Sequence, residues 1–275
     1  MRPASHGVTF RSHLFGLTLL LRLVASRLDA QHIVVRDGSF GYVSTDGSEV
    51  LALDSIAHPS LIRAALCPRA RVHRVTYARR QARRPADNGR QVAANLGNAR
   101  GDVFRVSGGQ ALADETCYLT ADSSLAAGVL PVGPVTDSTC DGTHVRRAAE
   151  IKHRAVLHCW RLGTAGADVA ILALQFAVVD TSALASVVIA EGEQFFFQDF
   201  PAIYHGPEQD LWRVEDGGTV SPEAFAIPFI GQLRGTHFMG LTWAGAEGED
   251  SFLLVADSAR AFRAVRKSYR YWVPN

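Results

Sequence analysis

Short extended runs separated by turn residues fill residues 101–275, and no amphipathic stretch of helical length lies between them. Two pairs of runs are joined by glycine-containing turns and predict hairpins, namely 155–162 with 168–179 and 184–190 with 194–200. About nine or ten runs, at roughly 8–12-residue spacing, are typical of an antiparallel sandwich or barrel. The sequence therefore predicts a mainly β fold, an antiparallel sandwich or barrel with one or two short helices.

Two segments carry helix signals. Residues 145–152 are preceded by Thr143, which we expect to act as the N-cap. Phe262, Val265 and Tyr269 are spaced i, i+3 and i+7, which favours a second helix over residues 258–267 before a final edge strand. A single helical turn is expected after Ser221, because Pro222 suits the first helical position.

Charge is divided unequally along the chain. Residues 1–100 carry a net charge of +9 and residues 101–275 carry −8, which gives the overall +1. Residues 63–90 hold nine arginines and only one acid, and their large apolar residues are sparse. Such a segment buries too little to offset its ordering entropy. We therefore expect a basic, Arg-rich and poorly ordered segment over residues 31–100, followed by a mainly β globular domain over residues 101–275.

The N-terminus resembles an export signal. Arg2 and Arg11 precede an uncharged, leucine-rich stretch over residues 12–21, and Ala25 or Ala30 could end the removed segment. We expect residues 1–30 to be a signal peptide, and the protein to be secreted or periplasmic. An Arg-rich, acid-poor organellar transit segment is the alternative. The chain contains 26 Arg and 2 Lys, which is typical of GC-rich coding and favours a bacterial source.

Four cysteines are present, at positions 67, 117, 140 and 159, and they allow three disulfide pairings in an exported chain. Cys140 and Cys159 flank His144, His153 and His158, and Cys117 precedes them, so a zinc-stabilised module is an alternative. The usual Cys-x2-Cys pair is missing, and no metal ligand or cofactor is assigned. We expect a disulfide instead.

Aromatic and acidic residues gather in two stretches, 205–218 and 243–250. Indole faces stack on the apolar side of sugar rings, and carboxylates accept hydrogen bonds from sugar hydroxyls. The candidate ligand-binding residues are His205, Asp210, Trp212, Arg213, Glu215, Asp216, Trp243 and Glu247.

The sequence favours an exported β-rich binding or structural module without catalysis. The alternative is a carbohydrate-active hydrolase that uses carboxylates of 208–216 and 247–250, since two carboxylates at a suitable separation cleave glycosides. A carbohydrate or a cell-surface molecule is the expected partner. Nucleic acid is not, because Tyr77 is the only aromatic residue within the arginine tract. The longest uncharged apolar run, 169–179, is shorter than the ~18 residues that a membrane-spanning helix needs.

Overall fold

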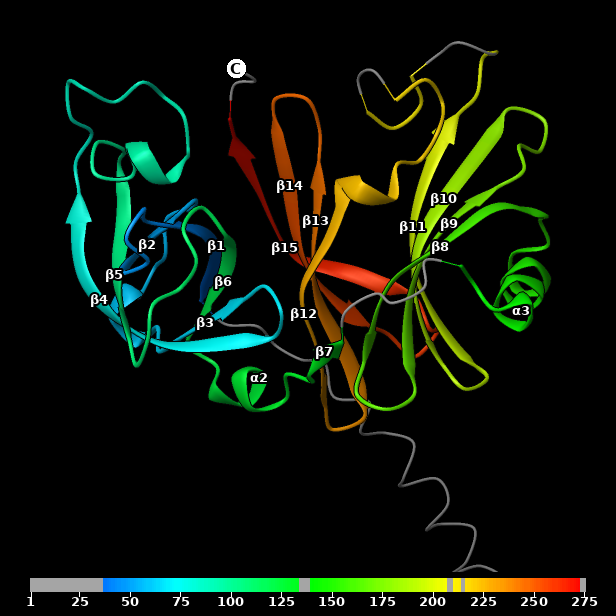
Figure 1. Cartoon of the computed structure of the whole chain (residues 1–275), viewed down its shortest axis with the longest axis horizontal. Helices are drawn as coiled ribbons and strands as arrows, with labels where there is room; N and C mark the ends of the chain where they lie inside the picture. Colours follow the sequence, from blue (N-terminus) through cyan, green and yellow to red (C-terminus); the bar gives the residue numbers. More distant parts are fainter. Residues whose placement is uncertain (1–36, 134–138, 207–209, 214–215, 273–275) are drawn as a thin grey trace, which may run out of the picture. The chain divides into compact units, whose positions relative to one another are not determined.

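A computed structural model describes residues 37–133, 139–206, 210–213 and 216–272. The expected signal peptide, residues 1–30, lies outside the described residues. The described strands form three antiparallel sheets, and the fold is mainly β, as the sequence predicts (Figure 1).

The first sheet is a closed six-stranded barrel with the strand order β1-β2-β5-β4-β3-β6. Its strands are β1 (Gly38–Val43), β2 (Glu49–Ala52), β3 (Ala64–Cys67), β4 (Arg71–Gln81), β5 (Gly101–Ser107) and β6 (Thr116–Thr120). The short helices near it are η1 (Pro59–Leu61), η2 (Ala93–Asn95) and α2 (Ser123–Ala127).

The other two sheets have the orders β11-β10-β9-β8-β7 and β12-β13-β14-β15. The strands of the five-stranded sheet are β7 (Val132–Gly133), β8 (Val156–Ala165), β9 (Val169–Phe176), β10 (Ser182–Glu191) and β11 (Gln194–Ile203). Those of the four-stranded sheet are β12 (Phe225–Leu233), β13 (Thr236–Ala244), β14 (Gly248–Ala256) and β15 (Phe262–Tyr271). Helix α3 (Gly142–Lys152) precedes β8, and η3 (Pro222–Ala224) precedes β12.

The two open sheets pack face to face through a shared apolar core. Ile171 and Ile189 from one sheet join Met239 and Leu254 from the other. The opposite face of β9 is also covered, because Leu172 packs in the cluster beside α3. A strand buried on both faces explains why residues 169–176 form an almost uninterrupted apolar run.

The four-stranded sheet is covered on its other face by the barrel. Phe229, Phe238 and Leu253 from this sheet pack with Phe40 and Tyr118 from the barrel. Adjacent residues on β13, Phe238 and Met239, therefore serve two different cores, as the two-residue repeat of a strand requires.

The expectation of poorly ordered chain is wrong for residues 37–100, because they hold β1 to β4 of the barrel. The barrel also crosses the expected boundary at residue 101, since β5 pairs with β2 and β4. Each short strand supplies few apolar residues, and closure of the sheet gathers them around one core. On β4, Val75 is buried there while Arg74 is exposed.

The helix expected over residues 258–267 is also wrong. Residues 257–261 form a turn, and β15 then pairs with β14 from Ala256↔Phe262 to Gly248↔Tyr271. The backbone of β14 would otherwise lack partners along one side, and this outweighs the weak helical spacing. Helix α3 is present as predicted, but its N-cap is Asp141, whose side chain accepts the Thr143 N–H.

All four cysteines are paired. Cys67–Cys117 joins β3 to β6 inside the barrel, and Cys140–Cys159 joins the segment before α3 to β8. Their Cα–Cα separations are 4.3 and 5.8 Å. The expected disulfide is confirmed, and the structure selects one of the three pairings that the sequence left open.

Candidate functional site

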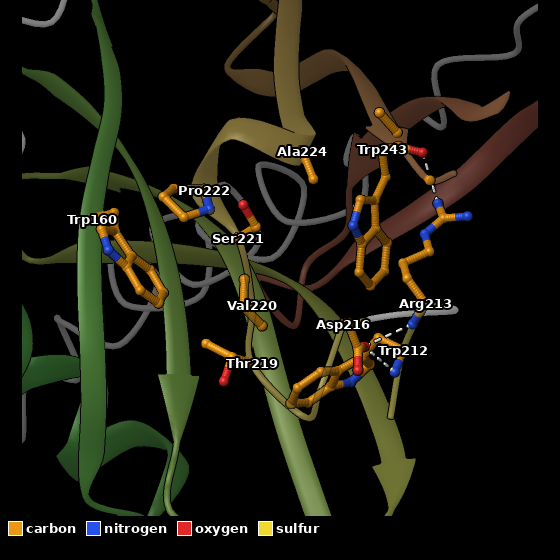
Figure 2. A pocket seen from close by; sticks show the side chains of 12 residues that line it. Trp160, Trp212, Arg213, Asp216, Thr219, Val220, Ser221, Pro222, Ala224 and Trp243 are labelled. Carbon is orange, nitrogen blue, oxygen red and sulfur yellow. Dashed lines mark hydrogen bonds between the residues drawn. The ribbon is translucent and has the colours of Figure 1, made fainter. Parts of the chain in front are cut away.

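Four of the eight candidate residues line one cavity of about 480 Å³ at an end of the two-sheet core. They are Trp212, Arg213 and Asp216 from the segment after β11, and Trp243 from β13. Trp160 from β8 completes the aromatic wall, and Figure 2 shows the three indoles around the cavity. Residues of the segment leading into η3 line the rest, namely Thr219, Val220, Ser221, Pro222 and Ala224.

The carboxylate of Asp216 holds the segment that carries Trp212 and Arg213. One oxygen accepts the backbone N–H groups of Leu211 at 2.9 Å and Gly218 at 2.8 Å. The other accepts those of Trp212 at 2.6 Å and Arg213 at 2.8 Å. Burial opposes ionisation, but the four N–H donors outweigh it and lower the pKa of Asp216. Asp216 is thus an ionised turn organiser.

The turn after Asp216 depends on glycine. Gly217 and Gly218 have φ angles of 54° and 75°, in the left-handed region that side chains with a Cβ rarely adopt. The chain therefore reverses immediately after the carboxylate, which brings the Gly218 N–H back to it. The sequence Asp-Gly-Gly is the local cause of this geometry.

The tryptophans are fixed by contacts outside the cavity. Trp243 is buried and packs against Phe200 and Phe225, with ring centroids 4.5 and 4.9 Å away. Trp212 donates its indole N–H to the Phe200 carbonyl at 2.9 Å. Trp160 is half-buried, packs against the core of the two open sheets and stacks on His158, with ring centroids 5.4 Å apart. Because all three rings are held in place, the cavity is a preformed aromatic site.

Arg213 lies against the back of this wall. Its guanidinium carbon is 4.5 Å from the centroid of the Trp243 ring, and Nη2 donates to the Trp243 carbonyl at 2.7 Å. The same nitrogen is 3.1 Å from the Asp250 carboxylate, which also pairs with Lys267 at 3.2 Å. Arg213 therefore neutralises Asp250 and orients the Trp243 ring.

The remaining candidates do not line the cavity. His205, Asp210 and Glu247 are exposed, and Asp210 accepts the Gly217 N–H at 3.1 Å within the same loop. Glu215 lies outside the described residues. The structure thus brings both tryptophans of the predicted set together with Arg213 and Asp216, and it leaves His205, Asp210 and Glu247 outside the cavity.

This arrangement bears on the hydrolase interpretation. Among the described residues that line the cavity, Asp216 is the one carboxylate, and both its oxygens accept backbone N–H groups. Asp250 is paired with two cations. Glu249, the residue before Asp250 on β14, accepts the Thr116 hydroxyl of the barrel instead. No carboxylate pair of the kind that glycoside cleavage requires is seen along the described wall of this cavity.

The zinc interpretation loses two of its ligands, because Cys140 and Cys159 are bonded to each other. Within the described part of the chain, no three His, Cys, Asp or Glu residues are grouped so that they could hold a metal ion. The helices that the structure describes include none of the length and hydropathy needed to cross a membrane.

Sequence reasoning missed Trp160, which precedes Trp212 by fifty-two positions. Its only signal was a place in a predicted hairpin strand, where a tryptophan usually packs into a core. Its position at the cavity depends on two structural contacts, the pairing of β8 with β9 and the packing of this sheet on β12–β15. Neither is local in the sequence.

Comparison of the chain with models of known protein families, with curated proteins and with solved structures finds no match.

Proposed function

We propose that this protein is a carbohydrate-binding module without a catalytic role, and that the tryptophan-lined cavity takes a sugar ring. One observation carries the proposal: Trp160, Trp212 and Trp243 come from three separate segments and converge on one cavity. The volume of about 480 Å³ falls within the roughly 300–1,000 Å³ of small-ligand sites.

The chemistry of the wall favours a sugar over a wholly apolar ligand. Indole faces bind the C–H face of a pyranose, and the exposed residue Thr219 lines the cavity with a hydroxyl that can exchange hydrogen bonds with ring hydroxyls. A binding role also agrees with how Asp216 is used, since a carboxylate committed to four N–H donors is a poor proton donor. A hydrolase would need an available acid at this wall.

We further propose that the module is exported by a bacterium to the cell surface, the periplasm or the medium. Two disulfides account for all four cysteines, and such bonds persist in oxidising compartments. A cell-surface glycan is then the expected partner. Mass spectrometry of the native protein tests this: removal of the first 25 or 30 residues together with two intact disulfides supports export, whereas a retained N-terminus with four free thiols contradicts it.

Binding is tested by titrating the protein with methyl glycosides of glucose, galactose, mannose and N-acetylglucosamine, followed by intrinsic fluorescence and calorimetry. At least one glycoside, or an oligomer of it, should bind saturably with a fluorescence change. Trp160→Ala should weaken that binding by about tenfold or more, since a lost aromatic contact costs roughly 0.5–1.5 kcal/mol beyond the lost area.

Trp272→Ala is the matched control, because Trp272 lies outside this cavity. It should bind the glycoside as the wild-type protein does. Equal affinity in the Trp160→Ala variant, or no binding to any sugar by the wild-type protein, would refute the proposal. Both variants are compared with the wild type by circular dichroism, so that a loss of fold is recognised.

A further inference from the structure

A second cavity, of about 390 Å³, lies where the barrel meets the four-stranded sheet. We call it the seam cavity. The barrel contributes residues from the loops after β3 and β4 and from the start of β6 with the loop before it, and the sheet contributes β12 to β15 and the residue that follows. Its lining residues are Pro68, Val92, Asp114, Glu115, Thr116, Ala226, Pro228, Thr242, Glu249, Arg270 and Trp272. It is separate from the tryptophan-lined cavity, with which it shares no lining residue.

Glu249 is the most enclosed carboxylate of the seam cavity, with 8% of the residue exposed. Its Oε1 accepts the Thr116 hydroxyl and lies 3.9 Å from Nη1 of Arg270. No described residue donates a hydrogen bond to its Oε2, which opens into the cavity. An enclosed carboxylate oxygen that opens into a cavity can take its donor from a bound group.

Arg270 does not supply that donor. Its Nε donates to the Gln91 carbonyl at 2.7 Å, and Nη1 donates to the Asp114 carbonyl at 2.7 Å and to Thr116 at 3.1 Å. Its Nη2 donates to the Asp114 carboxylate. The guanidinium is therefore committed to Asp114, and Glu249 receives only its more distant charge.

The third carboxylate, Glu115, is held by both of its oxygens to Arg71. Asp114 remains half-exposed, with 51% of its side chain accessible, and so marks the open side of the cavity. From the open side at Asp114 to the enclosed end at Glu249, hydrogen-bond acceptors of the lining therefore outnumber the donors that are not already bonded. Pro68, Pro228 and Trp272 add apolar surface to the lining.

We propose that the seam cavity binds a small alkylammonium ion, whose ammonium group donates to Glu249 and whose chain lies against Trp272 and the two prolines. An ammonium supplies three donors and a positive charge, so it can bond to the open Oε2 and add to the more distant charge of Arg270. A cation is also attracted to the face of an indole ring, as Arg270 already is, with its guanidinium carbon 5.5 Å from the centroid of the Trp272 ring. A metal ion is a poorer fit, since no three acidic or histidine side chains in the described residues are close enough to ligate one.

The state of Glu249 without a ligand agrees with this proposal. Burial raises the pKa of Glu249, and the Thr116 hydroxyl and Arg270 only partly oppose that effect. The charged groups that line the cavity with it are Asp114, Glu115 and Arg270. Because only the ionised carboxylate attracts an ammonium ion, affinity should rise with pH as Glu249 ionises.

The proposal is tested on the full chain with n-butylammonium chloride, followed by NMR amide shifts at constant ionic strength. The expected result is saturable binding of one ion, with shifts that centre on residues 114–116 and 249. Neutral 1-butanol should produce no saturable shift. Glu249→Gln should lower the affinity by about tenfold or more, since it removes the charge and keeps an acceptor for Thr116.

Glu247→Gln is the matched control, because Glu247 is an exposed glutamate outside the seam cavity. Its affinity for n-butylammonium should equal that of the wild type. The proposal fails if no shift saturates at up to about 50 mM ligand, if 1-butanol binds equally, or if Glu249→Gln binds as the wild type does. If Glu249→Gln does not fold, the pH series on the wild-type protein decides, and affinity that is independent of pH rejects the proposal. The result is independent of the glycoside titration, which probes the other cavity.

Discussion

Asp216→Asn should loosen the segment that carries Trp212 and Arg213, without unfolding the protein. Each oxygen of Asp216 accepts two backbone N–H groups, so the amide nitrogen of asparagine must face two donors whichever way it turns. Two hydrogen bonds are lost as a result. A hydrogen bond to a charged acceptor is worth roughly 1.5–3 kcal/mol, which gives about 3–6 kcal/mol for two.

The loop is only half-buried, so the released N–H groups recover part of this energy by bonding to water. We therefore expect the free energy of opening the loop to fall by about 2–4 kcal/mol. Since about 1.4 kcal/mol is a factor of ten, amide hydrogen exchange at residues 211–213 and 218 should accelerate by about 30- to 1,000-fold. The assay is hydrogen exchange followed by mass spectrometry or NMR.

Asp257→Asn is the matched control. Asp257 also stabilises a turn, but a single oxygen, Oδ1, accepts the N–H groups of Ala259 and Ala261, at 2.9 and 3.0 Å. Asparagine retains that oxygen, so exchange at this turn should change by less than about tenfold. Unchanged exchange at residues 211–213 in Asp216→Asn would refute the assigned role of the carboxylate.

The same role has a pH signature. The pKa of Asp216 is lower in the folded than in the unfolded chain, since burial is outweighed by its four N–H donors. Its contribution to stability is therefore complete above the unfolded pKa, near 3.9, and is lost as the pH falls through the folded value. Protection of the loop should decrease in acid, and it should not do so in Asp216→Asn.

Three further predictions concern other parts of the molecule. Replacing both Cys67 and Cys117 by Ala removes a cross-link that spans 50 residues, which should cost about 4 kcal/mol, or roughly 8–16 °C in Tm by calorimetry; an unchanged Tm would contradict this. Glu249→Gln should flatten the pH dependence of stability measured by urea denaturation. Burial raises the pKa of Glu249, so ionisation of this group at a pH above its pKa in the unfolded chain destabilises the wild-type fold. An equal change of stability with pH in both proteins would argue against this assignment. Arg213→Gln should lower stability by about 1–2 kcal/mol and weaken glycoside binding, because Trp243 loses its cation contact and the donor to its carbonyl; binding equal to that of the wild type would show that Arg213 does not orient the ring.

The local sequence determined most of the two open sheets. Both predicted hairpins are present, as β8–β9 and β10–β11, because apolar, β-branched and aromatic runs flank short glycine turns. The strands β12, β13 and β14 form for the same reason. Alternation and turn chemistry act over a few residues, and a sequence displays them directly.

The candidate site was predictable only in its contiguous part. Trp212, Arg213 and Asp216 lie within five residues, and their gathering of aromatic, basic and acidic groups marked them as a loop of interest. The use of Asp216 as a turn organiser could have been suspected from the Asp-Gly-Gly that it begins. Trp160 and the seam cavity were out of reach, because both depend on which sheets pack together.

The sequence by itself determined that the chain is antiparallel β, where its hairpins turn and which loop holds its aromatic cluster. Only the tertiary structure decided that residues 37–100 fold, how the cysteines pair and that residues 262–271 form a strand. The physical reason is the same in each case. Partners distant in sequence stabilise each of these features, whether an arginine-rich segment with few apolar residues, a thiol or an edge strand. Barrel closure and sheet packing bring those partners within reach.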